Sequence, residues 1–212
     1  GTTEKMAEIL LAERPDLSTD PESANRLLVA HCPERVLPGK IMEEMAANDR
    51  VIGGLNPLST DRAKQLYSFF CNGEMLLTNA TTAEMAKLTE NSFRDVNIAF
   101  ANELSIISDK LGIDVWELIE LANHHPRVNI LNPGPGVGGH CIAVDPWFIV
   151  SSAQEEAKLI RTAREVNDGK PAYVIAKITE AVEAEGADSI AALGIAFKPD
   201  IDDLRESPAL SI

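Results

Sequence analysis

Residues 81–111 read TTAEMAKLTENSFRDVNIAFANELSIISDKL, and the architecture of the chain is built around them. Apolar side chains recur here three or four positions apart, which is the spacing of an amphipathic helix. The apolar positions are Met85, Leu88, Val96, Ala99, Leu104, Ile107 and Leu111. The pattern predicts one long helix, and a helix of this length typically forms the spine of a domain or the seam of a dimer.

The residues before this helix alternate between short apolar runs and helical segments. Thr2 and Thr3 precede a pattern that predicts a capped helix near the start of the chain. Strands are predicted over residues 27–30, 50–54 and 74–78, with a helix over 60–71. This alternation indicates an α/β sheet, in which ligands bind at the carboxyl ends of the strands.

The residues after the long helix are predicted to be mainly helical. Helices are expected over 114–123, about 153–167 and 171–185, the last opened by Lys170 and Pro171. Residues 189–195 then predict a strand of a new α/β unit, and Ser207 with Pro208 caps its next helix. These patterns divide the chain into three regions: part of an α/β domain at 1–79, a helical middle at 80–168, and the start of another domain at 169–212.

The composition is that of an acidic protein without a membrane segment. Acidic residues number 33 against 19 basic ones, which gives a net charge of −14. Because such a surface repels phosphates, binding to nucleic acid is not expected. No apolar run approaches about 18 residues, and no signal peptide is visible, so we expect a cytoplasmic protein. A phosphate-bearing ligand would need local cations such as Lys87, Arg127, Lys198 and Arg205.

The cysteines favour reduced thiols. Cys32, Cys71 and Cys141 are far apart and odd in number, which does not fit a disulfide framework. Their spacing fits no zinc site either, so no metal is expected.

A glycine-rich run ends at one of these cysteines. Residues 134–146 read GPGVGGHCIAVDP, so Cys141 follows the glycines and Asp145 lies four positions later. Glycine lets a bulky ligand approach the backbone, and a deprotonated thiol is a strong nucleophile. If a helix begins here, the thiol and the carboxylate share one face. The alternatives are a small buried hydrophobe for Cys141 and a helix N-cap before Pro146 for Asp145.

Further polar candidates lie on the long helix and at a strand end. Lys87 and Asn91 are four residues apart and project together, which suits them to stabilise negative charge on an oxygen. Such residues also line solvated helix faces. Glu34 follows Cys32 and Pro33 at the end of a strand and is a candidate general base or a surface carboxylate.

Two later segments carry cations. The adjacent histidines at 124–125 point apart on a helix, so Arg127 is the better candidate for binding a phosphate or a sugar. The loop at 197–207 follows a predicted strand and precedes a helix. Backbone N–H groups meet Lys198 and Arg205 there, which is a common position for phosphate.

Five blocks of these residues occur in one order along the chain. They read HCPER at 31–35, AEMAKLTEN at 83–91, HPRV at 125–128, GPGVGGHCIAVD at 134–145 and FKPDIDDLRESP at 197–208. This order resembles the UDP-glucose/GDP-mannose dehydrogenase family over nearly the whole chain. Residues 90–104 and 129–131 are most similar to the members that oxidise UDP-N-acetyl-D-mannosamine.

The resemblance implies an α/β fold and an oxidoreductase activity. The family resemblance further implies that residues 1–79 are the C-terminal part of an NAD-binding Rossmann-like domain. Residues 80–168 would be an all-helical dimerisation domain with a long spine helix. The start of a C-terminal Rossmann-like domain that binds the nucleotide sugar would follow at 169–212. The implied reaction is a four-electron oxidation of the sugar C6 alcohol to a carboxylate, with NAD as hydride acceptor, in the synthesis of surface polysaccharides.

The resemblance also implies catalytic roles. Cys141 would attack the intermediate aldehyde to give a thiohemiacetal, and a second hydride transfer would leave a thioester that water hydrolyses. Lys87 and Asn91 would hold the C6 oxygen. Asp145 would position or activate a water, and Glu34 would serve in thioester hydrolysis.

Binding roles follow from the same resemblance. Arg127 would reach the UDP-sugar across a homodimer, and Arg205 would lie near the NAD pyrophosphate. The nucleotide sugar would be lined by Asn132, Pro133, Gly134, Pro135, Gly136, Val137, Gly138, Phe197 and Lys198.

Some features depart from the family pattern. Val144 stands where UDP-glucose dehydrogenases commonly carry lysine. The N-terminal glycine fingerprint for NAD and the last part of the C-terminal domain are absent, so the isolated chain is expected to lack turnover. UDP-glucose or another UDP-N-acetylhexosamine is the alternative substrate, and a non-catalytic dimerisation fragment is the alternative function.

Overall fold

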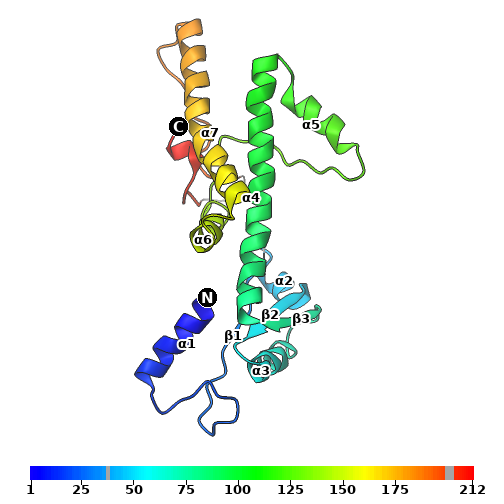
Figure 1. The fold of residues 1–212 in the computed structure, drawn as a ribbon. Helices are drawn as coiled ribbons and strands as arrows, with labels where there is room; N and C mark the ends of the chain where they lie inside the picture. The colour runs from blue at the N-terminus through cyan, green and yellow to red at the C-terminus, as the bar shows by residue number, and fades with distance from the viewer. Residues whose placement is uncertain (37–38, 199–202) are drawn as a thin grey trace. The chain divides into compact units, whose positions relative to one another are not determined.

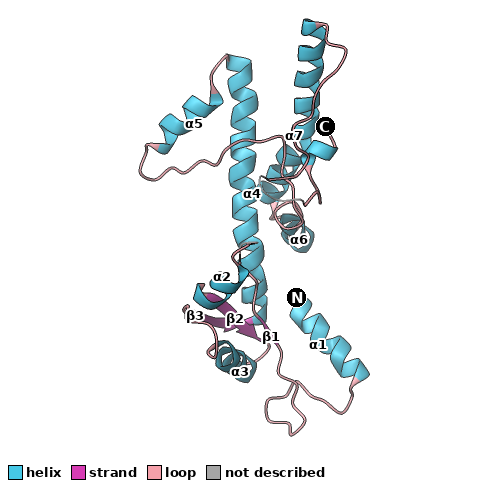
Figure 2. Cartoon of the chain, turned by 180° about the vertical axis from the view of Figure 1, so that it is seen from behind, coloured by secondary structure: helices cyan, strands magenta, loops and turns pink. Residues whose placement is uncertain are grey.

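The structure divides into two compact units. The computed structural model describes residues 1–36, 39–198 and 203–212. The first unit comprises Gly1–Lys87 and the second Leu88–Ile212 (Figure 1). Helices predominate, and the strands form one small sheet in the first unit (Figure 2). The fold is therefore mixed α/β, as expected, and mostly helical.

The first unit is built on a three-stranded sheet. Its elements are α1 (Thr2–Glu13), β1 (Ala30–His31), α2 (Ile41–Ala47), β2 (Arg50–Gly54), α3 (Pro57–Tyr67) and β3 (Met75–Asn79). The strand order is β1-β2-β3, with β3 parallel and β1 antiparallel to β2. Asn56 caps α3, because its side chain accepts a hydrogen bond from Ser59 N at 2.8 Å. The strand–helix–strand unit from β2 to β3 is the part of the α/β pattern that the sequence predicts best.

The second unit is helical. The long helix α4 (Ala80–Leu111) begins in the first unit and continues into the second. It is followed by α5 (Val115–Asn123), α6 (Asp145–Ser152), α7 (Lys158–Glu185) and the short 3₁₀ helix η1 (Pro208–Leu210). The predictions of helices over 81–111 and 114–123 are confirmed.

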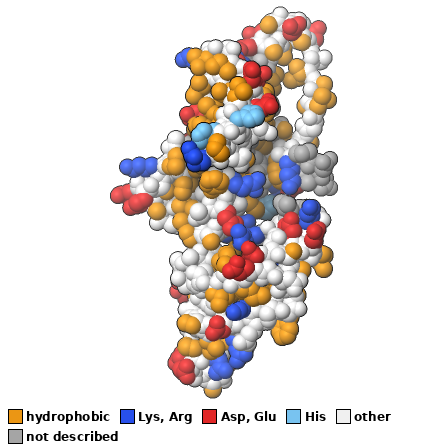
Figure 3. Space-filling view, turned by 90° about the vertical axis from the view of Figure 1, so that its right-hand side faces the viewer, with side chains coloured by type: hydrophobic (Ala, Val, Ile, Leu, Met, Phe, Trp, Pro, Cys, Tyr) orange, Lys and Arg blue, Asp and Glu red, His pale blue; other side chains and the backbone are white. Residues whose placement is uncertain are grey.

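The apolar core of the second unit is small. Ile149, Val150 and Ala157 form it, and Leu88 and Ile160 pack against it. Many large hydrophobic side chains remain exposed, as the space-filling view of one face shows (Figure 3). Buried polar contacts also join α4 and α7 in this unit.

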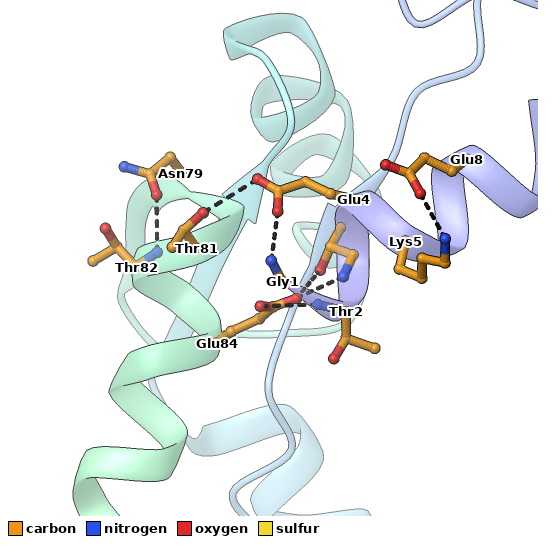
Figure 4. Close-up of polar contacts among 10 residues, drawn as sticks. Gly1, Thr2, Glu4, Lys5, Glu8, Asn79, Thr81, Thr82 and Glu84 are labelled. Atoms are coloured by element: carbon orange, nitrogen blue, oxygen red, sulfur yellow. Dashed lines mark hydrogen bonds and ion pairs between the residues drawn. The ribbon is translucent and has the colours of Figure 1, made fainter. Parts of the chain in front are cut away.

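Helix α1 is capped by a carboxylate from another element (Figure 4). Glu84 of α4 accepts hydrogen bonds from the backbone N and the hydroxyl of Thr3, both at 2.6 Å, and from Thr2 N at 3.3 Å. Burial raises the pKa of Glu84, but these bonds outweigh it and hold the pKa below the ordinary value of 4.5. The threonines lie inside the helix, so the prediction that they supply the cap is wrong.

The first predicted strand is displaced. Residues 27–30 were expected to form it, but β1 is Ala30–His31. Leu27 N donates to Ser18 O at 2.7 Å, so the apolar run begins by pairing with the preceding loop rather than with the sheet. The sequence pattern does not predict that β1 runs antiparallel to β2.

The helices around Pro171 form one element. Separate helices were expected over about 153–167 and 171–185, but α7 runs unbroken from Lys158 to Glu185 with Pro171 inside it. Proline removes one N–H and disfavours the preceding helical turn. Contacts of Asn167 and Lys170 with α4 stabilise the helix on that side of the proline. The separate helix α6 occupies residues that no predicted helix covered.

The predicted strand at 189–195 does not form. These residues have no strand conformation, and Ile190 and Leu193 are exposed. A strand needs a neighbouring strand for its backbone hydrogen bonds, and the described residues offer none at this point. Ser207 donates through Oγ to Ile195 O at 2.7 Å instead of capping η1, although Pro208 does occupy its first turn. The predicted phosphate position at Pro199 and Asp200 lies outside the described residues.

Candidate active site

The predicted site residues are divided between the two units. Glu34 and Lys87 belong to the first unit. The second unit contains Asn91, Arg127, Asn132, Pro133, Gly134, Pro135, Gly136, Val137, Gly138, Cys141, Asp145, Phe197, Lys198 and Arg205. Most of the candidate chemistry is therefore carried by one compact unit.

Cys141 lies in a turn that leads into α6. Its carbonyl accepts hydrogen bonds from Val144 N at 3.1 Å and Asp145 N at 2.8 Å, and its thiol is exposed. Asp145 is the first residue of α6, so its carboxylate lies at the positive end of the helix dipole. The alternative role of Asp145 as N-cap is wrong, because Val144 occupies that position. Cys141 is not a buried hydrophobe either.

Asn91 of α4 contacts the Asp145 carboxylate directly. Asn91 Nδ2 donates to Asp145 Oδ2 at 2.5 Å. Asn91 is buried and Asp145 is half-buried, so the amide fixes the direction of the carboxylate from the protein side. The other carboxylate oxygen has lone pairs that suit it to orient a water or to accept a proton.

The glycine loop packs against Phe197. A Cβ atom on Gly138 would lie 2.4 Å from Cβ of Phe197, and Gly139 has a φ of +83°. Glycine is required at the first position by close approach and at the second by backbone conformation. Gly139 N donates to Arg205 O at 3.1 Å. The predicted sugar-lining loop, Phe197 and Arg205 are thus neighbours.

Arg205 is paired with an acidic residue two positions before it. Its Nε donates to Asp203 Oδ1 at 2.9 Å and its Nη2 to Oδ2 at 2.6 Å. These bonds raise the pKa of Arg205, with a smaller contribution from Cys141. They also lower the pKa of Asp203 to about 2, and His140 contributes in the same direction. The guanidinium therefore lies within electrostatic range of the glycine loop and its cysteine.

Asparagine side chains hydrogen-bond the backbone ahead of the glycine loop. Asn97 and Asn123 bond the backbone of residues 130–131 at distances between 2.7 and 3.0 Å. Asn102 Oδ1 accepts from Gly134 N at 2.8 Å. Side chains of α4 and α5 therefore fix the residues that lead into the predicted sugar-lining segment, and Asn102 of α4 bonds Gly134 within it.

A buried polar network behind this segment was missed by the sequence reasoning. Arg164 Nη1 bonds Asp95 Oδ1 at 2.6 Å, and neither side chain is more than 2% exposed. Asn167 and Asn102 extend the network with bonds of 2.8 Å. Burial raises the pKa of Asp95, against the attraction of Arg164. A signal was present, because asparagine is unfavourable inside helices and α4 carries three of them.

The remaining candidate residues are Glu34, Lys87, Arg127 and Lys198. Glu34 is half-exposed and accepts from the buried Arg50 Nη1 at 3.4 Å. Lys87 is half-buried on α4. Arg127 is exposed on the segment after α5, and Lys198 is exposed after Phe197. The roles given to these four residues stay predictions.

The first unit has a cavity where a parallel sheet usually binds ligands. It has a volume of about 420 Å³ at the carboxyl ends of β2 and β3, and Gly54, Asn56, Thr60 and Asn79 are among its lining residues. Gly54 N donates to Thr60 Oγ1 at 2.9 Å, and the Asn56 side chain caps α3. The N–H groups of Gly54 and Ser59 are therefore already bonded within the protein.

The described residues contain neither a metal-binding group nor a membrane-spanning helix. Within 1–36, 39–198 and 203–212, no group of three or more His, Cys, Asp or Glu is placed to hold a metal ion. Over the same residues, no helix is both long and apolar enough to cross a bilayer. The candidate site is therefore described by its thiol, carboxylates, amides and cations.

Protein-family models match two consecutive parts of the chain. The NAD binding domain of the UDP-glucose/GDP-mannose dehydrogenase family matches residues 1–71, and the central domain of the same family matches residues 81–169. The chain belongs to this family. The resemblance seen in the five sequence blocks is thereby confirmed.

Curated members of the family are similar along the whole chain. A UDP-N-acetyl-D-mannosamine dehydrogenase from Campylobacter jejuni is 62% identical over 214 residues, which cover 100% of this chain and 53% of that protein. An NDP-N-acetyl-D-galactosaminuronic acid dehydrogenase from Ralstonia nicotianae is 59% identical and is covered to 51%. The chain spans about half the length of these relatives.

A solved structure of the family has the same fold over the matched half. The UDP-D-ManNAc dehydrogenase from Pyrococcus horikoshii is 47% identical and aligns with a TM-score of 0.88. The match covers 100% of this chain and 50% of that one. The fold of this chain is therefore similar to the matched half of another member of the family.

Proposed function

We propose that the protein carrying this chain oxidises C6 of UDP-N-acetyl-D-mannosamine to the uronate, with NAD as hydride acceptor. The observation that carries the proposal is the exposed thiol of Cys141 at the end of the glycine loop. The Asp145 carboxylate begins the helix that follows, and it is fixed by Asn91 at 2.5 Å. In this arrangement the thiol is suited to form a covalent intermediate, and the carboxylate is suited to accept a proton or to orient a water.

The proposed reaction proceeds in two oxidations. The first removes a hydride from C6 and a proton from its hydroxyl, with Asn91 and Lys87 stabilising the charge on oxygen. The Cys141 thiolate then adds to the aldehyde, and the resulting thiohemiacetal loses a second hydride from C6 and the proton of its hydroxyl to become a thioester. Water directed by Asp145 attacks the thioester, the carboxylic acid leaves, and the thiol is regenerated. Glu34 serves this last step in the same proposal.

The proposed domain roles follow the family. Residues 1–79 are the end of an NAD-binding Rossmann-like domain, residues 80–168 a central dimerisation domain, and residues 169–212 the start of a nucleotide-sugar domain. NAD supplies the hydride acceptor in both oxidations. The cavity at the ends of β2 and β3 would take part of the cofactor, while Arg205, now paired with Asp203, would turn to its pyrophosphate. We place the reaction in the cytoplasm, as a step toward polysaccharide precursors.

The proposed substrate rests on the names of similar proteins. The Campylobacter jejuni and Pyrococcus horikoshii enzymes are both named for N-acetylmannosamine. The Ralstonia nicotianae protein, nearly as similar, is named for N-acetylgalactosaminuronic acid. An N-acetylhexosamine is common to these names, so the configuration of the sugar is the finer part of the proposal.

The proposed homodimer rests on an apolar stripe on α4. Phe93, Phe100 and Ile107 recur every seven residues and are 69%, 52% and 44% exposed. Trp116 and Leu121 of α5 are exposed as well. Large apolar side chains at this spacing are typical of a helix seam that a second copy covers. Arg127 lies on the segment after α5, where it would reach across such a dimer.

The direct test is NADH formation by the complete protein with a panel of nucleotide sugars. The panel contains UDP-N-acetylmannosamine, UDP-N-acetylglucosamine, UDP-N-acetylgalactosamine and UDP-glucose. We expect the highest kcat/KM with UDP-N-acetylmannosamine and two NADH for each uronate. Preference for another N-acetylhexosamine would overturn only the sugar configuration. A dimer that forms no NADH with any sugar would establish the alternative, a non-catalytic dimerisation module.

A further inference from the structure

The side-chain amide of Asn102 hydrogen-bonds the glycine loop through its oxygen and the protein interior through its nitrogen. Its Oδ1 accepts from Gly134 N at 2.8 Å, and its Nδ2 donates to Asn167 Oδ1 at 2.8 Å. The side chain is fully buried in α4. Because asparagine lowers the stability of a helix interior, its presence here calls for a compensating tertiary role.

The buried Asp95 carboxylate determines which group donates and which accepts in these hydrogen bonds. Asp95 is ion-paired with Arg164, and an ionised carboxylate can only accept hydrogen bonds. Asn167 therefore donates to Asp95, at 2.8 Å, and turns its own oxygen toward Asn102. Asn102 must then donate to Asn167, which leaves its oxygen for Gly134. The buried carboxylate thus determines that an acceptor, and not a donor, faces the loop.

The glycine loop is held by backbone hydrogen bonds at two points. Gly134 N bonds Asn102 before the glycines, and Gly139 N bonds Arg205 O after them. Residues 135–138, which lie between these points, belong to the proposed sugar-lining segment, and Cys141 lies two positions after Gly139. A loop ordered before binding loses less conformational entropy when ligand binds.

We infer that Asn102 is a positioning residue for the glycine loop. Together with Asn167 it connects the Asp95–Arg164 pair to Gly134, so that the loop is ordered for the nucleotide sugar before the sugar arrives. The role in sugar binding rests on the proposed function, but the order of the loop does not.

The first arm of the test measures loop order by amide hydrogen exchange in the complete protein. Asn102→Ala is expected to speed exchange at residues 134–141 while the amides of α4 and α7 stay protected. The matched control is Asp109→Ala, which removes another α4–α7 contact, to Tyr173 and Lys177, without touching the loop. Unchanged exchange at 134–141 in Asn102→Ala, or equal loosening in the control, would overturn the proposal.

The second arm measures kinetics on the same variants. For Asn102→Ala we expect KM for the nucleotide sugar to rise roughly tenfold, about the effect of one net hydrogen bond, with KM for NAD unchanged. A general loss of structure would raise KM for the nucleotide sugar and KM for NAD together. That result would overturn the positioning role. If no sugar is oxidised by the parent protein, the proposed function fails while the exchange result still decides the role of Asn102.

A second pair of variants covers the case in which Asn102→Ala does not fold. Gly134→Ala keeps the N–H, and its Cβ would meet nothing closer than 3.7 Å. Gly134→Pro removes the N–H and leaves the buried network unchanged. We expect faster exchange at residues 136–141 only in Gly134→Pro. Equal exchange in the two variants would show that the bond to Asn102 does not order the loop.

Discussion

The hydrogen bond between Asn91 and Asp145 joins an amide to the carboxylate that the proposed mechanism needs in its ionised form. The two residues are 54 positions apart in sequence, so the bond depends on how α4 and α6 pack. An amide in this position donates to the carboxylate without competing for a proton. The hydrogen bond therefore fixes the direction of the Asp145 carboxylate.

Exchanging the two side chains separates folding from catalysis. In Asn91→Asp two carboxyl groups would face each other at about the present 2.5 Å, so we expect loss of stability as pH rises and both become charged. The double variant Asn91→Asp with Asp145→Asn restores one amide and one carboxylate. Its thermal stability should return toward the parent value, while kcat stays on the order of 100-fold lower or worse because the carboxylate has moved. Recovery of kcat with stability would contradict the role given to Asp145.

At the scale of single elements, the contact between α1 and α4 rests on the Glu84 carboxylate. It accepts from two backbone N–H groups and one hydroxyl at the start of α1 (Figure 4). These N–H groups have no partner within their own helix, so the carboxylate acts as a cap supplied by tertiary structure. Two elements that are distant in the sequence are thereby stabilised together.

This cap predicts a pH dependence. The folded pKa of Glu84 lies below the ordinary 4.5, so its stabilisation is present above pH 4.5 and is lost as pH falls through the folded pKa. Glu84→Gln should flatten this part of the pH profile and cost about 1 kcal/mol at neutral pH. Hydrogen exchange of α1 amides against pH measures it. Glu8→Gln, which removes only an exposed pair with Lys5, is the matched control and should change little.

The elements also show what the sequence predicts and what it does not. The long helix and β2 follow from apolar periodicity, a local property that residues 81–111 and 50–54 carry themselves. Pro171 inside α7 could not be predicted, because contacts with α4 outweigh the local effect of proline. The strand expected at 189–195 failed for a related reason, since strand formation needs a partner that periodicity does not reveal.

The same limit applies to the candidate site. Cys141 and Asp145 could be named from their spacing and from the resemblance of their sequence block. The bond from Asn91 to Asp145 and the network behind Asn102 could not, because each joins residues more than 30 positions apart. Sequence motifs indicated which groups are present, and packing decided which of them meet.

In the molecule as a whole, the stripe on α4 is an apolar surface that the described residues leave uncovered. Phe93, Phe100 and Ile107 would leave a row of apolar side chains in water if the chain acted alone. Covering such a row with its own copy gives a symmetric interface in which each residue meets its equivalent or a near neighbour. The proposed dimer therefore accounts for a surface that folding of one chain leaves exposed.

Charged substitutions in the stripe test the dimer. Phe93→Glu combined with Phe100→Glu places buried like charges in the seam, so we expect the dimer to dissociate into monomers. Sedimentation equilibrium of the complete protein measures the change. The control is Lys158→Glu, which adds the same side chain at an exposed position of α7 and should leave the dimer intact. A monomeric parent protein, or a variant that stays dimeric, would contradict the interface.

In the proposed mechanism, Cys141 carries the sugar as a covalent intermediate during the second oxidation. Product analysis of the complete protein with UDP-N-acetylmannosamine and NAD, for the parent and for Cys141→Ser, tests it most directly. The parent should give uronate with two NADH for each molecule. Cys141→Ser should give no uronate, because an ester to serine is a far less reactive acyl intermediate than a thioester. Uronate formed by Cys141→Ser at the parent rate would contradict the claim.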